Sequence, residues 1–267
     1  MVLMGCEKMI NMHKGYFIEK SNKIEILNSI RSELYELTKK IFNFEHQDVN
    51  YGLNNFHKLT ENTTGTELNE KRVLLINEFN NKLNLGDLIF NAFKDTIISL
   101  LGPDILVQKN CNIVIQKPND PNPSELHRDA PANSPYEIVL WIPLVDCYKS
   151  KAMYVVDFKN TKKLYEQINK IKDWELFEKS AKTLSKEIAV QYGEGLFFST
   201  AILHGSNINI EKETRFSLNI RFKNIFSPSG LKNQLQFFRK INTSDLTNIG
   251  SIIELQKSKF LNKTIYR

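Results

Sequence analysis

The chain has 267 residues, of which 41% are hydrophobic and 25% are charged, and its formal net charge at pH 7 is +6. This length and apolar content suffice for a full core and favour one domain with additions over two equal domains. The lysines are spread along the chain rather than gathered in a dense basic stripe, so nucleic-acid binding is not expected. No apolar run is long enough to cross a bilayer, so a membrane-spanning protein is not expected either.

The three cysteines, Cys6, Cys111 and Cys147, have neither the spacing of a metal site nor that of a disulfide framework. This pattern favours a reduced, cytoplasmic setting. Cys6 follows Leu3-Met4-Gly5, as in a lipoprotein cleavage site, but no apolar segment of signal-peptide length precedes it. We therefore expect a cytoplasmic protein. Its net charge would suit an anionic small-molecule substrate, although spread charge is usually only a solvated surface.

Apolar residues recur at three- and four-residue spacing through the first hundred residues, as amphipathic helices require. Ser21 precedes the first stripe and is expected to cap the helix start. The three stripes are Ile24, Leu27, Ile30, Leu34, Leu37 and Ile41; Val73, Ile76, Phe79 and Leu83; and Ile89, Phe93, Ile97 and Leu100. Gly102 and Pro103 end the last helix and mark the expected start of a β core. These helices would brace the outer face of that core.

Beyond Pro103 the chain contains short runs of strand-forming residues. The first run has the β-branched density of a buried strand and stops at Pro118, where a loop rich in Asn and Pro begins. The runs cover residues 112–117, 136–144, 152–156 and 193–204. Short strands in succession predict a barrel or jelly roll. The expected fold class is therefore mainly β with flanking helices, a double-stranded β-helix with N-terminal helical support.

The period turns helical again between residues 160 and 184, inside the strand-rich region. This segment would form either a lid or wall over the substrate or a helix packed outside the barrel. The tail from Ser227 carries no chemical motif and would pack back on the barrel or mediate association. The predicted division of one domain, 1–267, is helical support over 1–103, a jelly-roll core over 104–226 with the insertion 160–184, and a C-terminal extension over 227–267.

The triplet His127-Arg128-Asp129 follows the Pro-rich loop, and His204 ends the last apolar run. In an extended segment residues i and i+2 point to the same side, so His127 and Asp129 can chelate one ion while Arg128 faces away. Two imidazoles and one carboxylate on one face hold Fe(II) and leave coordination positions free for a cosubstrate and oxygen. We interpret His127, Asp129 and His204 as iron ligands. The alternatives are a solvated loop for the first two and a hydrogen-bonded core histidine for His204.

A second His-x-Asp pattern, His46-Gln47-Asp48, serves as an internal control. It follows a predicted helix and lacks flanking strand patterns. No Arg-x-Ser pattern stands at the matching distance beyond the next histidine, His57. We interpret this second copy as surface.

The segment from Arg215 to Phe222 alternates strictly between polar and apolar residues. Arg215, Ser217, Asn219 and Arg221 therefore share one face of a predicted strand. Arg221 would lie roughly 20 Å from Arg215, at about 3.3 Å per residue, so the two cannot share one carboxylate. We expect Arg221 to meet substrate or solvent. Gln116, Lys117 and Trp141 would border a pocket or serve only in packing and at the rim.

This ordered set resembles the Fe(II)- and 2-oxoglutarate-dependent dioxygenases, and within them the phytanoyl-CoA-dioxygenase-like group. The resemblance spans about residues 104 to 226 and is carried by His127-x-Asp129, by Gly193-Glu194-Gly195-Leu196-Phe197-Phe198 leading to His204, and by Arg215-x-Ser217. The chain is also similar to oxygenases of this group from bacterial surface-carbohydrate gene clusters. The resemblance implies a metal at the open end of the barrel, with Arg215 pairing with the distal carboxylate of 2-oxoglutarate and Ser217 hydrogen-bonding it. A guanidinium, planar and always charged, suits that pairing.

The sequence thus predicts an Fe(II)/2-oxoglutarate-dependent oxygenase that hydroxylates or oxidises a small molecule, with a sugar or nucleotide sugar of carbohydrate biosynthesis as the candidate substrate. Asp129 fills the carboxylate position and leaves no site for a halide, which argues against a halogenase. The first alternative is a non-catalytic jelly-roll protein that binds a carbohydrate or similar ligand; the second is a metal-dependent cupin-type isomerase. Neither needs Arg215 and Ser217 beside the three ligands. The sequence leaves the substrate and the oligomeric state open.

Overall fold

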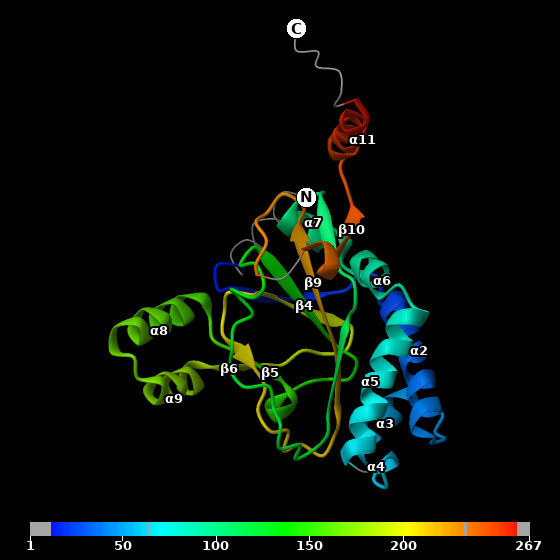
Figure 1. Ribbon diagram of the computed structural model, residues 1–267. Helices are drawn as coiled ribbons and strands as arrows, with labels where there is room; N and C mark the ends of the chain where they lie inside the picture. The colour runs from blue at the N-terminus through cyan, green and yellow to red at the C-terminus, as the bar shows by residue number, and fades with distance from the viewer. Residues whose placement is uncertain (1–11, 64, 232–233, 261–267) are drawn as a thin grey trace.

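The computed structural model describes residues 12–63, 65–231 and 234–260, and a seven-stranded antiparallel sheet lies at its centre (Figure 1). The strands are β1 (Tyr16–Lys20), β2 (Ile105–Gln108), β3 (Asn112–Gln116), β4 (Glu137–Pro143), β7 (Glu194–Ser199), β9 (Arg215–Asn224) and β10 (Phe238–Asn242). Their order is β1-β7-β4-β9-β2-β10, and β3 also pairs with β9. Strand β9 pairs with three others, β4, β2 and β3, and so connects the two halves of the sheet.

A second, three-stranded antiparallel sheet completes the jelly roll, in the order β6-β5-β8. Its strands are β5 (Met153–Val155), β6 (Lys186–Ile188) and β8 (His204–Gly205). The apolar run 193–204 is therefore not one strand: it supplies β7 to the large sheet, turns after Ser199 and supplies β8 to the small sheet. The two sheets with flanking helices confirm the predicted fold class.

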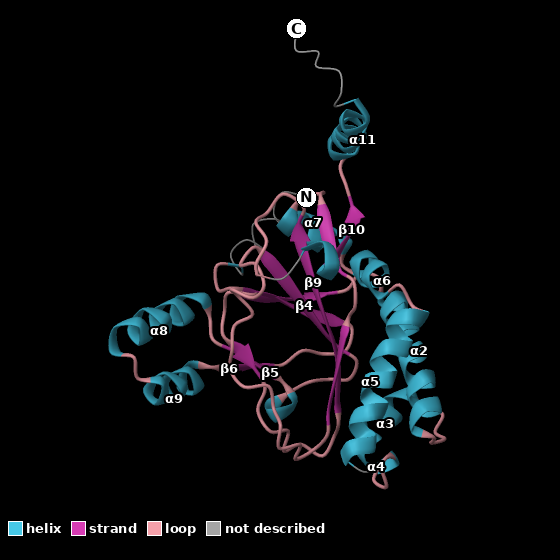
Figure 2. Ribbon diagram, viewed as in Figure 1, coloured by secondary structure: helices cyan, strands magenta, loops and turns pink. Residues whose placement is uncertain are grey.

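Helices cover the outer face of the large sheet, on one side of the molecule (Figure 2). They are α2 (Ile24–Phe42), α3 (Val49–Asn54), α4 (Phe56–Leu59), α5 (Gly65–Lys82), α6 (Leu85–Ala92) and α7 (Lys94–Leu101). The apolar face of β9 meets them: Phe216 lies edge-on to Phe56 with ring centroids 5.2 Å apart, and Phe222 contacts Phe90. The polar face of β9 consequently turns into the barrel, as the alternation predicts.

Two details of the expected helices are wrong. Ser21 does not cap α2: the helix begins after Lys23 without a side-chain cap, and the Ser21 hydroxyl instead donates to the Ala92 carbonyl oxygen at 2.9 Å. In the second stripe Val73 is wrong, because it is 58% exposed and Leu75 is buried in its place; the other three residues of the stripe, Ile76, Phe79 and Leu83, pack in or against the core as expected. Both differences arise because tertiary packing overrides local pattern.

Two strands of the large sheet lie outside residues 104–226. β1 pairs with β7 at one edge, and β10 pairs with β2 at the other. The N-terminal part is thus not only helical, and the tail returns to the sheet. The helix expected through Phe93 is divided there into α6 and α7, since Phe93 has a non-helical backbone.

The segment between β5 and β6 forms a hairpin of two helices, α8 (Phe158–Ile171) and α9 (Trp174–Leu184), which projects from the barrel (Figure 1). Asp157 and Asp173 cap these helices through their carboxylates. The remaining elements are η1 (Lys149–Lys151), α10 (Gln234–Phe237) and α11 (Asp245–Phe260). Among the described residues, no helix has both the length and the apolar character needed to cross a membrane.

We predict that the two described cysteines resist thiol reagents in the folded chain. Cys111 and Cys147 are buried free thiols, and burial raises the pKa of each to about 12, so almost no thiolate forms at pH 8. In a Cys6→Ser variant, an Ellman titration should detect no thiol before unfolding and both after addition of denaturant. Rapid reaction of either thiol in the native chain would contradict this burial.

Candidate metal centre

Two backbone hydrogen bonds bring the distant histidines together. The His127 N–H donates to the His204 carbonyl oxygen at 3.0 Å, and the His204 N–H donates to the His127 carbonyl oxygen at 2.8 Å. Residues directly opposite in an antiparallel pair project their side chains to the same side. The two imidazoles therefore lie next to each other, with ring centroids 4.5 Å apart.

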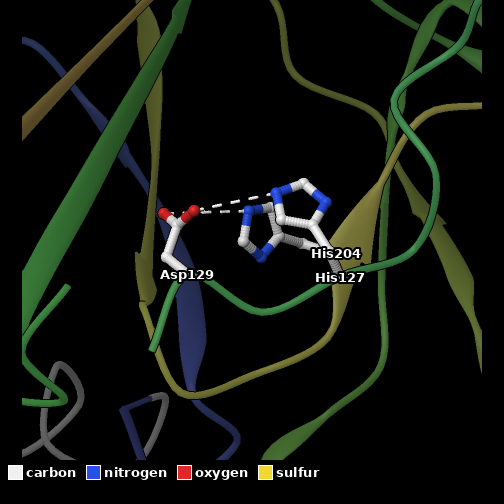
Figure 3. A group of neighbouring side chains, drawn as sticks. All are labelled: His127, Asp129 and His204. Atoms are coloured by element: carbon white, nitrogen blue, oxygen red, sulfur yellow. Dashed lines mark ion pairs between the residues drawn. The ribbon is translucent and has the colours of Figure 1, made fainter. Parts of the chain in front are cut away.

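Asp129 lies on the same side as both rings (Figure 3). Its Oδ1 is 3.7 Å from His127 Nε2, and its Oδ2 is 4.0 Å from His204 Nε2. Two ligand atoms each about 2.1 Å from one ion lie at most about 4.2 Å apart, so Oδ1 and His127 Nε2 can share a metal, and the carboxylate lies within the same range of His204. The sequence-predicted triad is thus a compact cluster, with its ligand atoms all within 4.8 Å of one another.

Backbone carbonyls orient the two rings. His127 Nδ1 is 2.7 Å from the Glu125 carbonyl oxygen, and His204 Nδ1 is 3.1 Å from the Ile202 carbonyl oxygen. Donation from Nδ1–H to these oxygens leaves Nε2 of each ring as the lone-pair donor facing Asp129. This arrangement of second partners is typical of metal-binding histidines.

The surroundings of the cluster set the protonation states of its ligands. Burial lowers the pKa of His204 to about 4, so this imidazole is neutral at pH 7. Burial alone would raise the pKa of Asp129, but its interaction with His127 and the charge of Arg221 outweigh burial and hold it well below the usual value. The interaction with Asp129 raises the pKa of His127. The carboxylate is therefore ionised beside a neutral His204.

The α8–α9 hairpin packs behind the segments that carry these ligands. Leu126 and Leu203, which immediately precede the two histidines, join a small apolar cluster with residues of both helices. The Arg128 guanidinium lies 3.7 Å from the centre of the Tyr165 ring on α8. Residues that alternate with the ligands thus face the hairpin, and Arg128 faces away from the triad as predicted. The hairpin thus contacts the ligand-bearing segments on the side that faces away from the triad.

The polar face of β9 holds buried groups without hydrogen-bond partners. Arg215 is 3% exposed, and the one side-chain hydrogen bond that it makes within the described part of the chain, from Nη1 to the Ala152 carbonyl oxygen, is 3.5 Å long. Among the described residues no partner contacts Arg215 Nε, Ser217 Oγ, Asn219 Oδ1 or Gln116 Oε1, all of them buried atoms. Burial lowers the pKa of Arg215, but a guanidinium remains charged in proteins. No acidic side chain of the described residues pairs with this guanidinium, and a buried charge without a counterion is costly, so this face of β9 fits an anionic ligand.

The other residues considered from the sequence have different surroundings. Gln116 lies directly opposite Arg215 in the β3–β9 pair, so the two side chains lie on the same side of the sheet. Lys117 turns to the outer face, where its Nζ lies 5.3 Å from the centre of the Phe56 ring. Trp141 belongs to the hydrophobic core. In the second His-x-Asp pattern, Asp48 caps α3.

One of the two surroundings expected for Arg221, solvent, is wrong. Arg221 does not meet solvent: it is 6% exposed, and its Nη2 and Nε donate to Asp129 Oδ2 at 2.7 and 3.2 Å. Its Nη1 donates to Gln108 Oε1 at 3.2 Å. The strand alternation places Arg221 on the interior face but gives no indication that Asp129 lies opposite, because that contact joins residues far apart in the sequence.

Solved structures share this fold. The chain matches a non-heme monooxygenase, ThoJ, in its nickel complex, with 15% identity and a TM-score of 0.55 over 89% of this chain and 84% of that one. The epimerase SnoN in complex with Fe3+, alpha ketoglutarate and nogalamycin RO matches with 12% identity and a TM-score of 0.53, over 86% and 87% of the two chains. EctD from S. alaskensis matches with 10% identity and a TM-score of 0.53, over 88% and 83%. At these identities the likeness is one of fold.

Comparison of the sequence itself gives no relative. No protein-family model matches it, and no curated protein matches it significantly. The site must therefore be argued from its own residues.

We predict that the contact between the hairpin and the ligand segments contributes strongly to stability. Leu203 is 1% exposed in the shared cluster, so Leu203→Ala should lower the free energy of unfolding by about 2 to 5 kcal/mol in urea titrations. Leu176 on α9 is 48% exposed, and Leu176→Ala, the matched control, should change it by about 0.5 kcal/mol or less. Equal effects of the two substitutions would contradict the packing described.

Proposed function

We propose that this chain is an Fe(II)- and 2-oxoglutarate-dependent oxygenase that hydroxylates or oxidises a small molecule. The observation that carries the proposal is one interior that contains both a two-histidine, one-carboxylate cluster and a buried arginine that has no counterion among the residues the structure describes. The fold shared with non-haem iron proteins supports the same conclusion, as a matter of analogy.

His127, Asp129 and His204 would hold the iron. Three ligands on one side leave neighbouring positions of an octahedral ion free. The neutral His204 ring and the ionised Asp129 match the ligand forms that a divalent cation requires. Phe198 lies against the His204 ring, with centroids 4.6 Å apart, and so restricts water on that side.

Arg215 and Ser217 would bind the distal carboxylate of 2-oxoglutarate. The planar guanidinium offers Nε and its other donors to two carboxylate oxygens, and the Ser217 hydroxyl can donate to the same group. Gln116 Oε1 can only accept a hydrogen bond, so it cannot bond to the carboxylate oxygens, which are acceptors too. It would instead accept a hydrogen bond from a donor group in the site. The dicarboxylate would thereby neutralise the buried charge of Arg215.

When bound, the iron and 2-oxoglutarate would supply the oxidising chemistry, in which dioxygen is the oxidant, 2-oxoglutarate is oxidatively decarboxylated to succinate and carbon dioxide, and the second oxygen atom oxidises the substrate. The chain's part is to position these groups and to exclude water. The paired backbone of His127 and His204 fixes two ligands, while β9 fixes the distal anchor. Substrate would meet the exposed side of the cluster, since His127 is the most exposed of the three ligands.

The finer assignments belong to the proposal as well. We infer a member of the phytanoyl-CoA-dioxygenase-like group, with a sugar or nucleotide sugar of carbohydrate biosynthesis as substrate, acting in the cytoplasm. Residues 104–226 would carry the chemistry, with residues 1–103 and 227–267 in support. The structural neighbour SnoN is named with a small-molecule ligand, nogalamycin RO, which agrees with a small-molecule substrate for this chain.

Anaerobic titration of the Fe(II)-loaded protein with 2-oxoglutarate tests the proposal. The visible charge-transfer band of the iron–keto-acid complex should appear. Arg215→Ala should weaken 2-oxoglutarate binding by a factor of roughly 30 or more, because loss of a buried charge partner costs about 2 to 5 kcal/mol. Asp129→Ala should abolish the band.

Arg239→Ala is the matched control, because Arg239 pairs with Asp87 away from the triad, and it should leave the band unchanged. Failure of the parent protein to bind iron would reject the oxygenase and favour the non-catalytic ligand-binding protein. Iron binding without any response to 2-oxoglutarate would instead favour the cupin-type isomerase.

A further inference from the structure

We propose that Arg221 is a positioning residue that holds Asp129 by one carboxylate oxygen, so that only the other oxygen is free to bind the metal. This role rests on the proposed iron site and assigns a function that the three ligands and the 2-oxoglutarate anchor do not cover. The contact of Arg221 with the triad is made through Asp129 Oδ2.

The contacts of Asp129 are unequal. Oδ2 accepts two hydrogen bonds from Arg221, from Nη2 at 2.7 Å and from Nε at 3.2 Å. Oδ1 faces His127 Nε2 at 3.7 Å, which is too long for a hydrogen bond. A carboxylate oxygen offers about two lone-pair sites, and both of those on Oδ2 are taken. The carboxylate is thus prepared to bind a metal through a single oxygen.

The guanidinium is itself held in place by two neighbouring strands. Arg221 belongs to β9, and its Nη1 donates to Gln108 Oε1 at 3.2 Å; Gln108 ends β2, which pairs with β9 at the adjacent residues Val107 and Phe222. Both side chains are buried, at 6% and 3% exposure. A planar fork fixed at three nitrogens can hold Asp129 Oδ2 in one position with two converging donors, which a lysine ammonium cannot do in the same geometry.

The alternative to a positioning role is that Arg221 competes with the metal for Asp129. An arginine paired with a ligating carboxylate could compete with the metal and leave Asp129 on binding. The two roles predict opposite signs: removal of a positioning arginine weakens metal binding, whereas removal of a competitor strengthens it. Partners of metal ligands typically contribute a factor of about 10 to 100 to metal affinity.

Co(II) alone is a suitable probe, measured by anaerobic calorimetry and by its visible ligand-field bands. Arg221→Gln should weaken Co(II) binding by a factor of about 10 to 100. Its bands should change in shape, because a released carboxylate can bind through both oxygens. Arg221→Lys retains the charge without the fork and should recover only part of the affinity. Arg239→Gln, the matched control, should match the parent in both measurements.

Removal of a buried arginine can also prevent folding, so Gln108→Leu provides a second variant. It leaves the contacts between Arg221 and Asp129 intact but removes the oxygen that fixes Nη1, and it should give a smaller loss of affinity in the same direction. Unchanged or tighter Co(II) binding in Arg221→Gln or Gln108→Leu, with unchanged bands, would overturn the positioning role while the proposed function stands. A parent protein that binds no metal would overturn the proposed function, and this role with it.

Discussion

The arrangement of the site depends on one short backbone pairing, the two hydrogen bonds between His127 and His204. This pair joins the segment after the Pro-rich loop to the first residue of β8 in the small sheet. Both rings, their Nδ1 contacts and the position of Asp129 follow from it. Without this pairing, His204 would not be held beside His127 and Asp129, and the three residues could not bind one ion.

The second constraint is the strict alternation of β9. Its phenylalanines and branched residues meet the helices, which obliges Arg215, Ser217, Asn219 and Arg221 to face the barrel interior. The two arginines on that face have opposite situations. Arg221 has a carboxylate and an amide as partners, whereas the Nε of Arg215 has none among the described residues. The strand β9 therefore contributes two different arginines. Arg221 forms an ion pair with a metal ligand, and Arg215 remains free to pair with a carboxylate. A dicarboxylate could bind the metal through one end and Arg215 through the other.

The features that could be predicted from the sequence are those set by residues close together in the chain. The i, i+2 spacing of His127 and Asp129, the outward direction of Arg128 and the two faces of β9 all follow from strand geometry, and the structure places these residues accordingly. Pairings between distant segments could not be read in this way. β1 and β10 join the sheet through partners far along the chain, and the crossing from β7 to β8 has no periodic signature. The contact of Arg221 with Asp129 could not be predicted either, because it joins distant parts of the chain. An alternating strand indicates which face a residue occupies but not which residue lies opposite it.

The central claim is that the metal cluster and Arg215 bind a single ligand between them. A crystal structure of the protein grown anaerobically with Fe(II) and 2-oxoglutarate tests it most directly, with the iron located by anomalous scattering. We predict an iron peak between His127 Nε2, His204 Nε2 and Asp129 Oδ1, and continuous density from that peak to the Arg215 guanidinium. An iron peak elsewhere, or 2-oxoglutarate bound without contact to Arg215, would contradict the account.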